Sequence, residues 1–138
     1  MRDLLGLGTE IVDVVSEGAS VDAHSIAARR IVSTSCATTF ADGVACRDPD
    51  PDAFALIMRG AARVFTVSDT EIAQAMRLLL RTTTHNFPEP ADAVALAGLL
   101  RERHRQCGRR VARVLTGGQR RCGNPGRSAS RPHTGANR

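Results

Sequence analysis

Lysine is the most informative absence from this sequence, because all 19 of its basic residues are arginine. Arginine stays protonated at physiological pH and is not a usable amine nucleophile. No side chain in these 138 residues can therefore form a Schiff base with a carbonyl compound. Tryptophan and tyrosine are also absent, and phenylalanine occurs four times. The core must therefore be built from aliphatic side chains.

Long apolar runs are absent as well. No stretch approaches the roughly 20 residues that a membrane helix needs, and the opening residues MRDLLGLGTE contain no signal-peptide pattern. The four cysteines form no Cys-x-x-Cys pair and have no zinc-finger spacing from histidine. This usage favours reduced, partly buried thiols. We therefore expect a cytoplasmic protein without a membrane segment.

Acidic residues are missing from the last part of the chain, residues 119–138, which is rich in arginine, glycine, serine and proline. All 14 acidic residues lie in residues 1–118, so the net charge of +5 belongs to the tail. An arginine-rich arm can bind nucleic-acid phosphates, but the composition is also typical of an unstructured extension. We favour the extension and keep nucleic-acid binding as an alternative. The sequence thus predicts one domain, 1–118, and an Arg-rich disordered tail, 119–138.

Short β-branched runs alternate with longer amphipathic segments in residues 1–118. The short runs predict strands at 9–17, 63–68 and 111–115. The longer segments predict helices that begin near residues 20, 52, 69 and 90. This order indicates an α/β fold with a partial doubly wound, mostly parallel sheet and flanking helices. Three strands would leave sheet edges unpaired, so we expect part of a larger domain.

Local signals mark the helix starts. Ser20 and Asp52 are the expected N-caps of the first two helices. Ser68 and Glu71 form the Ser-x-x-Glu capping box of the third helix. The fourth helix begins near Glu89 or Pro90, and Gly108 is a plausible residue for its C-terminal turn.

Five segments resemble, in order and spacing, the C-terminal half of the catalytic domain of threonine dehydratases. They are TEIVDVVSEGA, TTFADGVACRDPDP, VSDTEIAQAMRLL, THNFPEPADAVALAGLL and VARVLTGG, and they cover about residues 7–118. The segments TFADGVA and VSDTEIAQAMRLL are the most specific. Threonine dehydratases are pyridoxal-phosphate enzymes with the tryptophan synthase β-like fold, also called fold type II, as are serine dehydratase and serine racemase. The resemblance implies a fragment of that fold.

The resemblance also implies a reaction, the β-elimination of water from threonine or serine to give a 2-oxo acid and ammonia. In the family, pyridoxal phosphate is held as a Schiff base on a lysine. That lysine and the glycine-rich phosphate loop lie upstream of the matched segments. Without a lysine, the resemblance implies a truncated dehydratase that is inactive alone. As an alternative, the chain is the non-catalytic half of a split enzyme, partnered by a complementary half-domain or forming a homo-oligomer.

Four cofactor-binding residues follow from the resemblance. Thr116 matches the hydroxyl or thiol residue that bonds the pyridine nitrogen, and Gly117 and Gly118 follow it. Glu89 matches a glutamate that lies close to the cofactor at the start of a helix. The family's next glycines are replaced here by Pro90 and Asp92, and the match ends at Gln119, where the family has asparagine.

No metal site is predicted. Some relatives bind a divalent cation at positions that correspond to Ser16, Ser20 and Asp22, but the family's glutamate is missing from this set. A hard cation needs several oxygen ligands in a fixed arrangement. His24, His85 and His104 are isolated and are interpreted as surface or packing residues. No catalytic residue is expected among these 138 residues.

Overall fold

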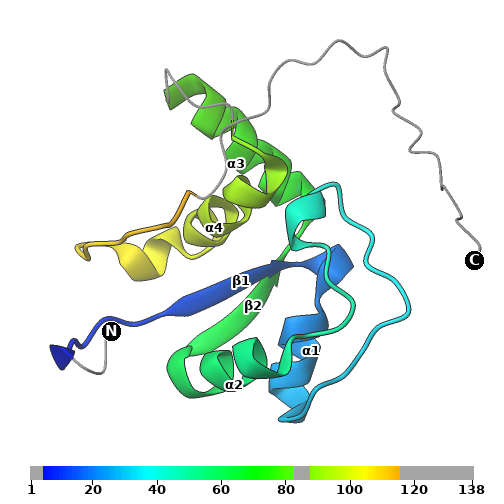
Figure 1. Ribbon diagram of the computed structural model, residues 1–138. Helices are drawn as coiled ribbons and strands as arrows, with labels where there is room; N and C mark the ends of the chain where they lie inside the picture. The colour runs from blue at the N-terminus through cyan, green and yellow to red at the C-terminus, as the bar shows by residue number, and fades with distance from the viewer. Residues whose placement is uncertain (1–4, 83–87, 116–138) are drawn as a thin grey trace, which may run out of the picture.

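A short parallel sheet lies between two layers of helices in the computed structural model, which describes residues 5–82 and 88–115. Strand β1 (Val12–Ser16) pairs with β2 (Arg63–Val67), with Val12 opposite Arg63 and Ser16 opposite Val67. Helices α3 and α4 cover one face, and α1 and α2 lie on the other (Figure 1). The predicted fold class, a partial parallel sheet with flanking helices, is confirmed.

The layer formed by α1 and α2, the lower one in Figure 1, differs from the prediction at the N-cap of each helix. Helix α1 (Val21–Ala28) follows the 3₁₀ turn η2 (Glu17–Ala19), and the Ser20 side chain makes no cap hydrogen bond. Its backbone is not in the extended conformation of a capping residue. Helix α2 (Pro51–Gly60) is capped by Asp50, not Asp52. The Asp50 carboxylate accepts from the Asp52 and Ala53 N–H groups at 3.0 and 2.9 Å.

The upper layer follows the sequence signals closely. Helix α3 (Asp69–Thr82) begins with the predicted capping box, in which the Ser68 N–H donates to Glu71 at 2.8 Å and the Glu71 N–H donates to Ser68 Oγ at 3.3 Å. Helix α4 (Pro90–Arg101) starts at the predicted proline. It ends earlier than expected, in the 3₁₀ turn η4 (Arg103–Gln106), and Gly108 then adopts a left-handed φ of 74°.

The hydrophobic core lies between α3, α4 and the upper face of the sheet. It is aliphatic, as predicted, and consists of Ala41, Val67, Ile72, Ala75, Leu79, Ala93, Val94, Leu96 and Ala97, with Phe65 packed beside it. Gly98 brings α4 onto the sheet, because a Cβ added there would lie 2.6 Å from Val14 Cγ2. Helix α2, in contrast, has no buried residue.

The prediction of a third strand at residues 111–115 is wrong. These residues form no strand and run back alongside α4 after the turn at Gly108 (Figure 1). Val111 and Val114 are 48% and 74% exposed. A strand needs a neighbour for its backbone hydrogen bonds, and the described residues place none beside this segment.

Two smaller expectations also need correction. The mostly apolar run at 9–17 predicts a strand that is buried on both faces, but Val12, Asp13 and Val14 of β1 are half-buried. Cys36, Cys46 and Cys107 are unpaired, as predicted, but they are exposed. Among the described residues, no helix is long and apolar enough to cross a membrane.

Candidate functional site

The side chain of Asp69 holds a loop at the C-terminal ends of β1 and β2. Asp69, the first residue of α3, accepts hydrogen bonds from Ser16 Oγ at 3.3 Å, Thr39 Oγ1 at 2.5 Å and the Phe40 N–H at 3.3 Å. The loop before η3 (Asp42–Val44) is therefore tied to the end of β1 and to the start of α3. This is the edge at which open α/β sheets usually bind ligands.

A close backbone contact also holds this loop. The Thr38 N–H donates to the Gly18 carbonyl at 2.7 Å, and a Cβ added at Gly18 would lie 1.8 Å from the Thr38 oxygen. Only glycine fits such an approach. The described strand ends are therefore covered by their own loop.

Glu89 lies at the start of α4, next to this loop. Its N–H donates to Asp92 Oδ2 at 3.0 Å, so the Asp92 carboxylate turns back to cap its own helix. Asp92 is 3% exposed. A Cβ added at Gly43 of η3 would lie 2.9 Å from the Ala91 Cβ, so the loop packs tightly against the first turn of α4. The replacement of a family glycine by Asp92 is thus accommodated by helix capping.

The other predicted cofactor residues, Thr116, Gly117 and Gly118, lie outside the described residues, as do His85 and the tail. Among the positions that the resemblance relates to a cation site, Ser16 donates from Oγ to Asp69 and accepts from the Gly18 N–H at 3.2 Å. Asp22 lies near enough to Asp13 to raise the pKa of that carboxyl. Across residues 5–82 and 88–115, no group of three or more histidine, cysteine, aspartate or glutamate side chains could hold a metal ion.

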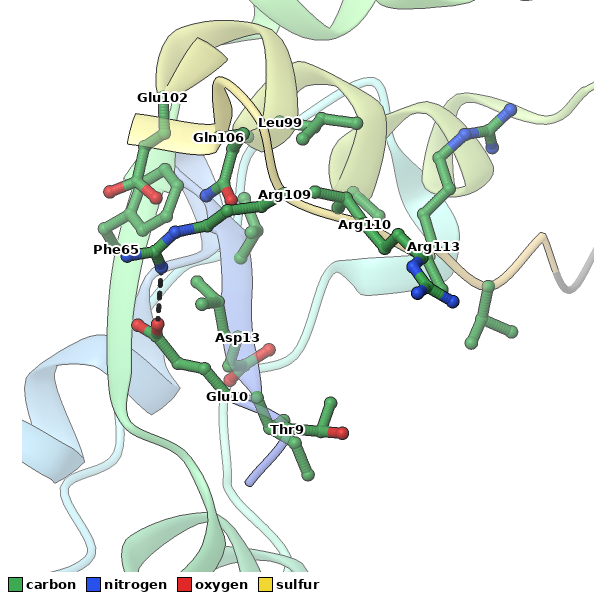
Figure 2. Close-up of a pocket in the computed structure, with 18 of the residues that line it drawn as sticks. Thr9, Glu10, Asp13, Phe65, Leu99, Glu102, Gln106, Arg109, Arg110 and Arg113 are labelled. Carbon is green, nitrogen blue, oxygen red and sulfur yellow. Dashed lines mark ion pairs between the residues drawn. The ribbon is translucent and has the colours of Figure 1, made fainter. Parts of the chain in front are cut away.

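A cavity of about 790 Å³, which the sequence did not predict, opens at the other end of the sheet. Its lower wall is residues 8–14, leading into and along β1, and its opposite wall is residues 109–114. Ala95, Gly98 and Leu99 of α4 line it as well. Figure 2 shows Glu10 and Asp13 on the β1 side and the arginines at 109, 110 and 113 across from them.

Ion pairs join the walls of this cavity. Arg109 pairs with Glu10 at 3.6 Å (Figure 2). Arg63 on β2 also pairs with Glu10, and it pairs with Glu102 at the end of α4, donating from Nε at 3.2 Å. The hydrogen bond and charge of Arg63 lower the pKa of Glu102. The positive and negative charges at this end of the molecule thus hold the helix layer to the sheet.

Asp13 is the unusual acid of the cavity wall. Burial raises its pKa, the nearby Asp22 carboxylate raises it further, and a hydrogen bond from the Val14 N–H opposes both effects. Burial also raises the pKa of Asp22. Burial, and for Asp13 also the neighbouring Asp22, therefore disfavours the charged forms of these side chains in the folded chain.

Comparison with known proteins decides the family. The model of the pyridoxal-phosphate dependent enzymes matches residues 2–117. The chain belongs to the family of pyridoxal-phosphate dependent enzymes. It is 33% identical over 108 residues to an L-threonine ammonia-lyase of Geobacter sulfurreducens, and the match covers 78% of this chain and 27% of that enzyme.

Solved structures of this enzyme family agree. The chain is similar to a threonine deaminase from T.th., with a TM-score of 0.68 and 30% identity over 75% of this chain and 38% of that one. Maize serine racemase has a TM-score of 0.73 and 24% identity over 88% of this chain and 38% of that one, and it shows the fold alone. The chain thus spans between a quarter and two fifths of the length of these relatives.

The described residues do not form a complete site for the family's cofactor. Pyridoxal phosphate needs donors around its phosphate and a partner for its pyridine nitrogen. The strand ends are covered by the loop that Asp69 and Gly18 hold, and the large cavity lies at the opposite end of β1. Of the four predicted cofactor residues, the described part of the chain includes Glu89.

Proposed function

We propose that these residues are part of the catalytic domain of a pyridoxal-phosphate-dependent lyase that removes water from threonine or serine, giving a 2-oxo acid and ammonia. The match of the family over residues 2–117 carries this proposal. A lyase is favoured over a racemase because two relatives at 30% identity or more are named L-threonine ammonia-lyase and threonine deaminase. The serine racemases compared are below 25% identical.

The catalytic lysine must come from outside these 138 residues, because they contain none. We assign to Thr116 the hydroxyl that bonds the pyridine nitrogen, to Gly117 and Gly118 the close approach of the backbone, and to Glu89 a position beside the cofactor. These residues form one wall, completed by the lysine-bearing part of the domain. Residues 119–138 form a tail outside the domain. Since free amino acids are the proposed substrates, we also propose a cytoplasmic location.

The experiment compares the purified chain alone with the chain mixed with the part of the Geobacter sulfurreducens enzyme that precedes the matched residues. Ammonia and 2-oxo acid are measured with threonine and with serine in the presence of pyridoxal phosphate. We expect no turnover by the chain alone and turnover by the mixture.

A pair of threonine variants tests the assignment of the wall. Thr116→Ala is expected to lower turnover by the mixture roughly tenfold, the effect of one lost hydrogen bond. Thr134→Ala, in the tail, should leave turnover unchanged. Turnover by the chain alone, or equal effects of the two variants, would contradict the proposal.

A further inference from the structure

Asp69 joins three parts of the chain through one carboxylate. Ser16 Oγ, at the end of β1, donates to Oδ1 at 3.3 Å, Thr39 Oγ1 donates to the same oxygen at 2.5 Å, and the Phe40 N–H donates to Oδ2 at 3.3 Å. The bond from Thr39 has the length of a charge-assisted hydrogen bond, which is about twice as strong as a neutral one. Asp69 is also the first residue of α3, where the helix dipole favours a negative charge. The carboxylate is therefore a fixed attachment point for the loop.

The hydroxyl of Thr39 connects Asp69 to the backbone of the loop. It donates to the carboxylate and accepts from the Ala41 N–H at 3.2 Å, so the one oxygen is used both as donor and as acceptor. Ala41 is fully buried in the core, whereas the Phe40 side chain is 44% exposed. Hydrogen bonds to Asp69, and not burial of the Phe40 ring, therefore hold this part of the loop in place.

The other side of the loop lies against the start of α4. A Cβ added at Gly43 of η3 would lie 2.9 Å from the Ala91 Cβ, so the backbone of η3 is in close contact with the first turn of the helix. Glu89 is the N-cap of α4, and its carbonyl accepts from the Asp92 N–H at 3.0 Å. Because closely packed groups transmit displacements to one another, a shift of the loop moves the turn that carries Glu89.

We propose that Asp69 and Thr39 are positioning residues of the cofactor site, which hold η3 against α4 and thereby fix Glu89 beside pyridoxal phosphate. The inference rests on the proposed function, because that function assigns Glu89 its place beside the cofactor. Asp69 and Thr39 act through the loop and do not touch the cofactor. A misplacement of about 1 Å at a reacting centre can lower turnover about a hundredfold, so loss of these hydrogen bonds lowers kcat.

The test uses the 138-residue chain mixed with a saturating amount of the part of the Geobacter sulfurreducens enzyme that precedes the matched residues. Initial rates of ammonia release over a range of threonine concentrations, with pyridoxal phosphate present, give kcat and KM of the assembled complex. Loss of an interaction made only in the transition state lowers kcat and leaves KM unchanged. A purely structural loss lowers the fraction of folded chain instead, which circular dichroism measures.

Four variants locate the effect. Thr39→Val keeps the shape of the side chain without its hydroxyl, and it should lower kcat about tenfold with KM changed less than about twofold. Thr39→Ser keeps the hydroxyl and should restore kcat to within about twofold. Thr38→Val is the matched control, because the Thr38 side chain is exposed and its backbone N–H makes the bond to Gly18. Asp69→Asn is a second variant, in which one acceptor oxygen replaces two, and it should lower kcat at least about threefold.

A double-mutant cycle tests whether Thr39 acts through Glu89. In a Glu89→Gln background, Thr39→Val should lower kcat by less than about a further twofold, because the group that Thr39 positions is already altered. Amide hydrogen exchange of the chain alone gives an independent measurement. Thr39→Val should speed exchange at Glu89 and Asp92, whose amides are hydrogen-bonded in the first turn of α4, about tenfold. Thr38→Val should leave this exchange unchanged.

Three results would overturn the inference: equal kcat of Thr39→Val and Thr38→Val, failure of Thr39→Ser to restore kcat, or an undiminished effect of Thr39→Val in the Glu89→Gln background. Turnover by the unsubstituted mixture with unchanged exchange in Thr39→Val also overturns it and leaves the proposed function standing. No turnover by the unsubstituted mixture overturns the proposed function, and with it the role at the cofactor. Exchange at Glu89 and Asp92 then decides whether Thr39 fixes the start of α4.

Discussion

Replacing Gly98 by alanine tests the contact that sets α4 on the sheet. The added Cβ would lie 2.6 Å and 2.8 Å from the two Val14 methyl groups and 3.2 Å from Phe65 Cζ, whereas carbon atoms pack at about 3.5–4.0 Å. Because both methyl groups of Val14 are too close to the added atom, rotation of that side chain can move one of them away but not both. The helix or the strand must shift.

The expected change in the free energy of unfolding is the difference between two opposing effects. Overpacking of this kind costs about 1–3 kcal/mol, and alanine gains about 1 kcal/mol over glycine inside a helix. We expect a net loss of up to about 2 kcal/mol in the free energy of unfolding. Gly60→Ala is the control, because an added Cβ at this last residue of α2 would meet no atom within 4 Å. It should be neutral or slightly stabilising.

Urea unfolding followed by far-ultraviolet circular dichroism measures both variants, since the chain has no tryptophan or tyrosine for fluorescence. A double-mutant cycle with Val14→Ala isolates the contact. The two substitutions should be less destabilising together than their sum by about 1 kcal/mol. A Gly98→Ala variant as stable as the Gly60→Ala control, with an additive cycle, would refute the close packing.

Three further predictions concern carboxylates. Asp13→Asn should stabilise the chain at pH 7, because the raised pKa of Asp13 shows that its charged form is unfavourable in the folded state. This gain in stability should vanish below the usual pKa of 3.8, where Asp13 is protonated in both the folded and the unfolded chain. Glu102→Gln should have the opposite effect, because pairing with Arg63 lowers the pKa of Glu102. The free energy of unfolding should fall by about 1 kcal/mol at pH 7, and this loss should fade as the pH falls below 4.5. Urea unfolding at pH 7 and pH 3.5 measures the stability of both variants. Asp69→Ala removes the acceptor of three hydrogen bonds and should lower the free energy of unfolding by about 1–2 kcal/mol. Amide hydrogen exchange at residues 38–41 should become faster. Asp48→Ala, on the same long connection, is the control and should leave exchange at residues 38–41 unchanged.

The sequence predicted the elements whose signals are local. The Ser68–Glu71 capping box depends on residues of one helix, and the structure has it as predicted. The cap of α2 was misplaced by two residues because Asp50 and Asp52 flank the same proline. A choice between them depends on backbone conformation, and Asp50 is the residue with the extended backbone.

The third strand and the cavity could not be predicted in the same way. Val111–Leu115 has a strand pattern, but a strand depends on the neighbour that pairs with it, and that neighbour is a property of the whole sheet. The cavity is formed by residues 8–14 and 109–114, about 100 positions apart. A local sequence pattern carries no information about a contact between residues that lie so far apart in the chain. The family resemblance, in contrast, depends on motifs along the chain, and the comparisons confirm it.

The lack of buried residues in α2 has a consequence for proteolysis. Trypsin can cleave this chain at arginine alone, since lysine is absent, and exposed Arg47 and Arg59 lie on either side of most of α2. Cleavage requires local unfolding of the backbone at the cut, and a helix with no buried side chain opens most readily. Brief digestion should therefore release residues 48–59 while the core of α3 and α4 stays intact.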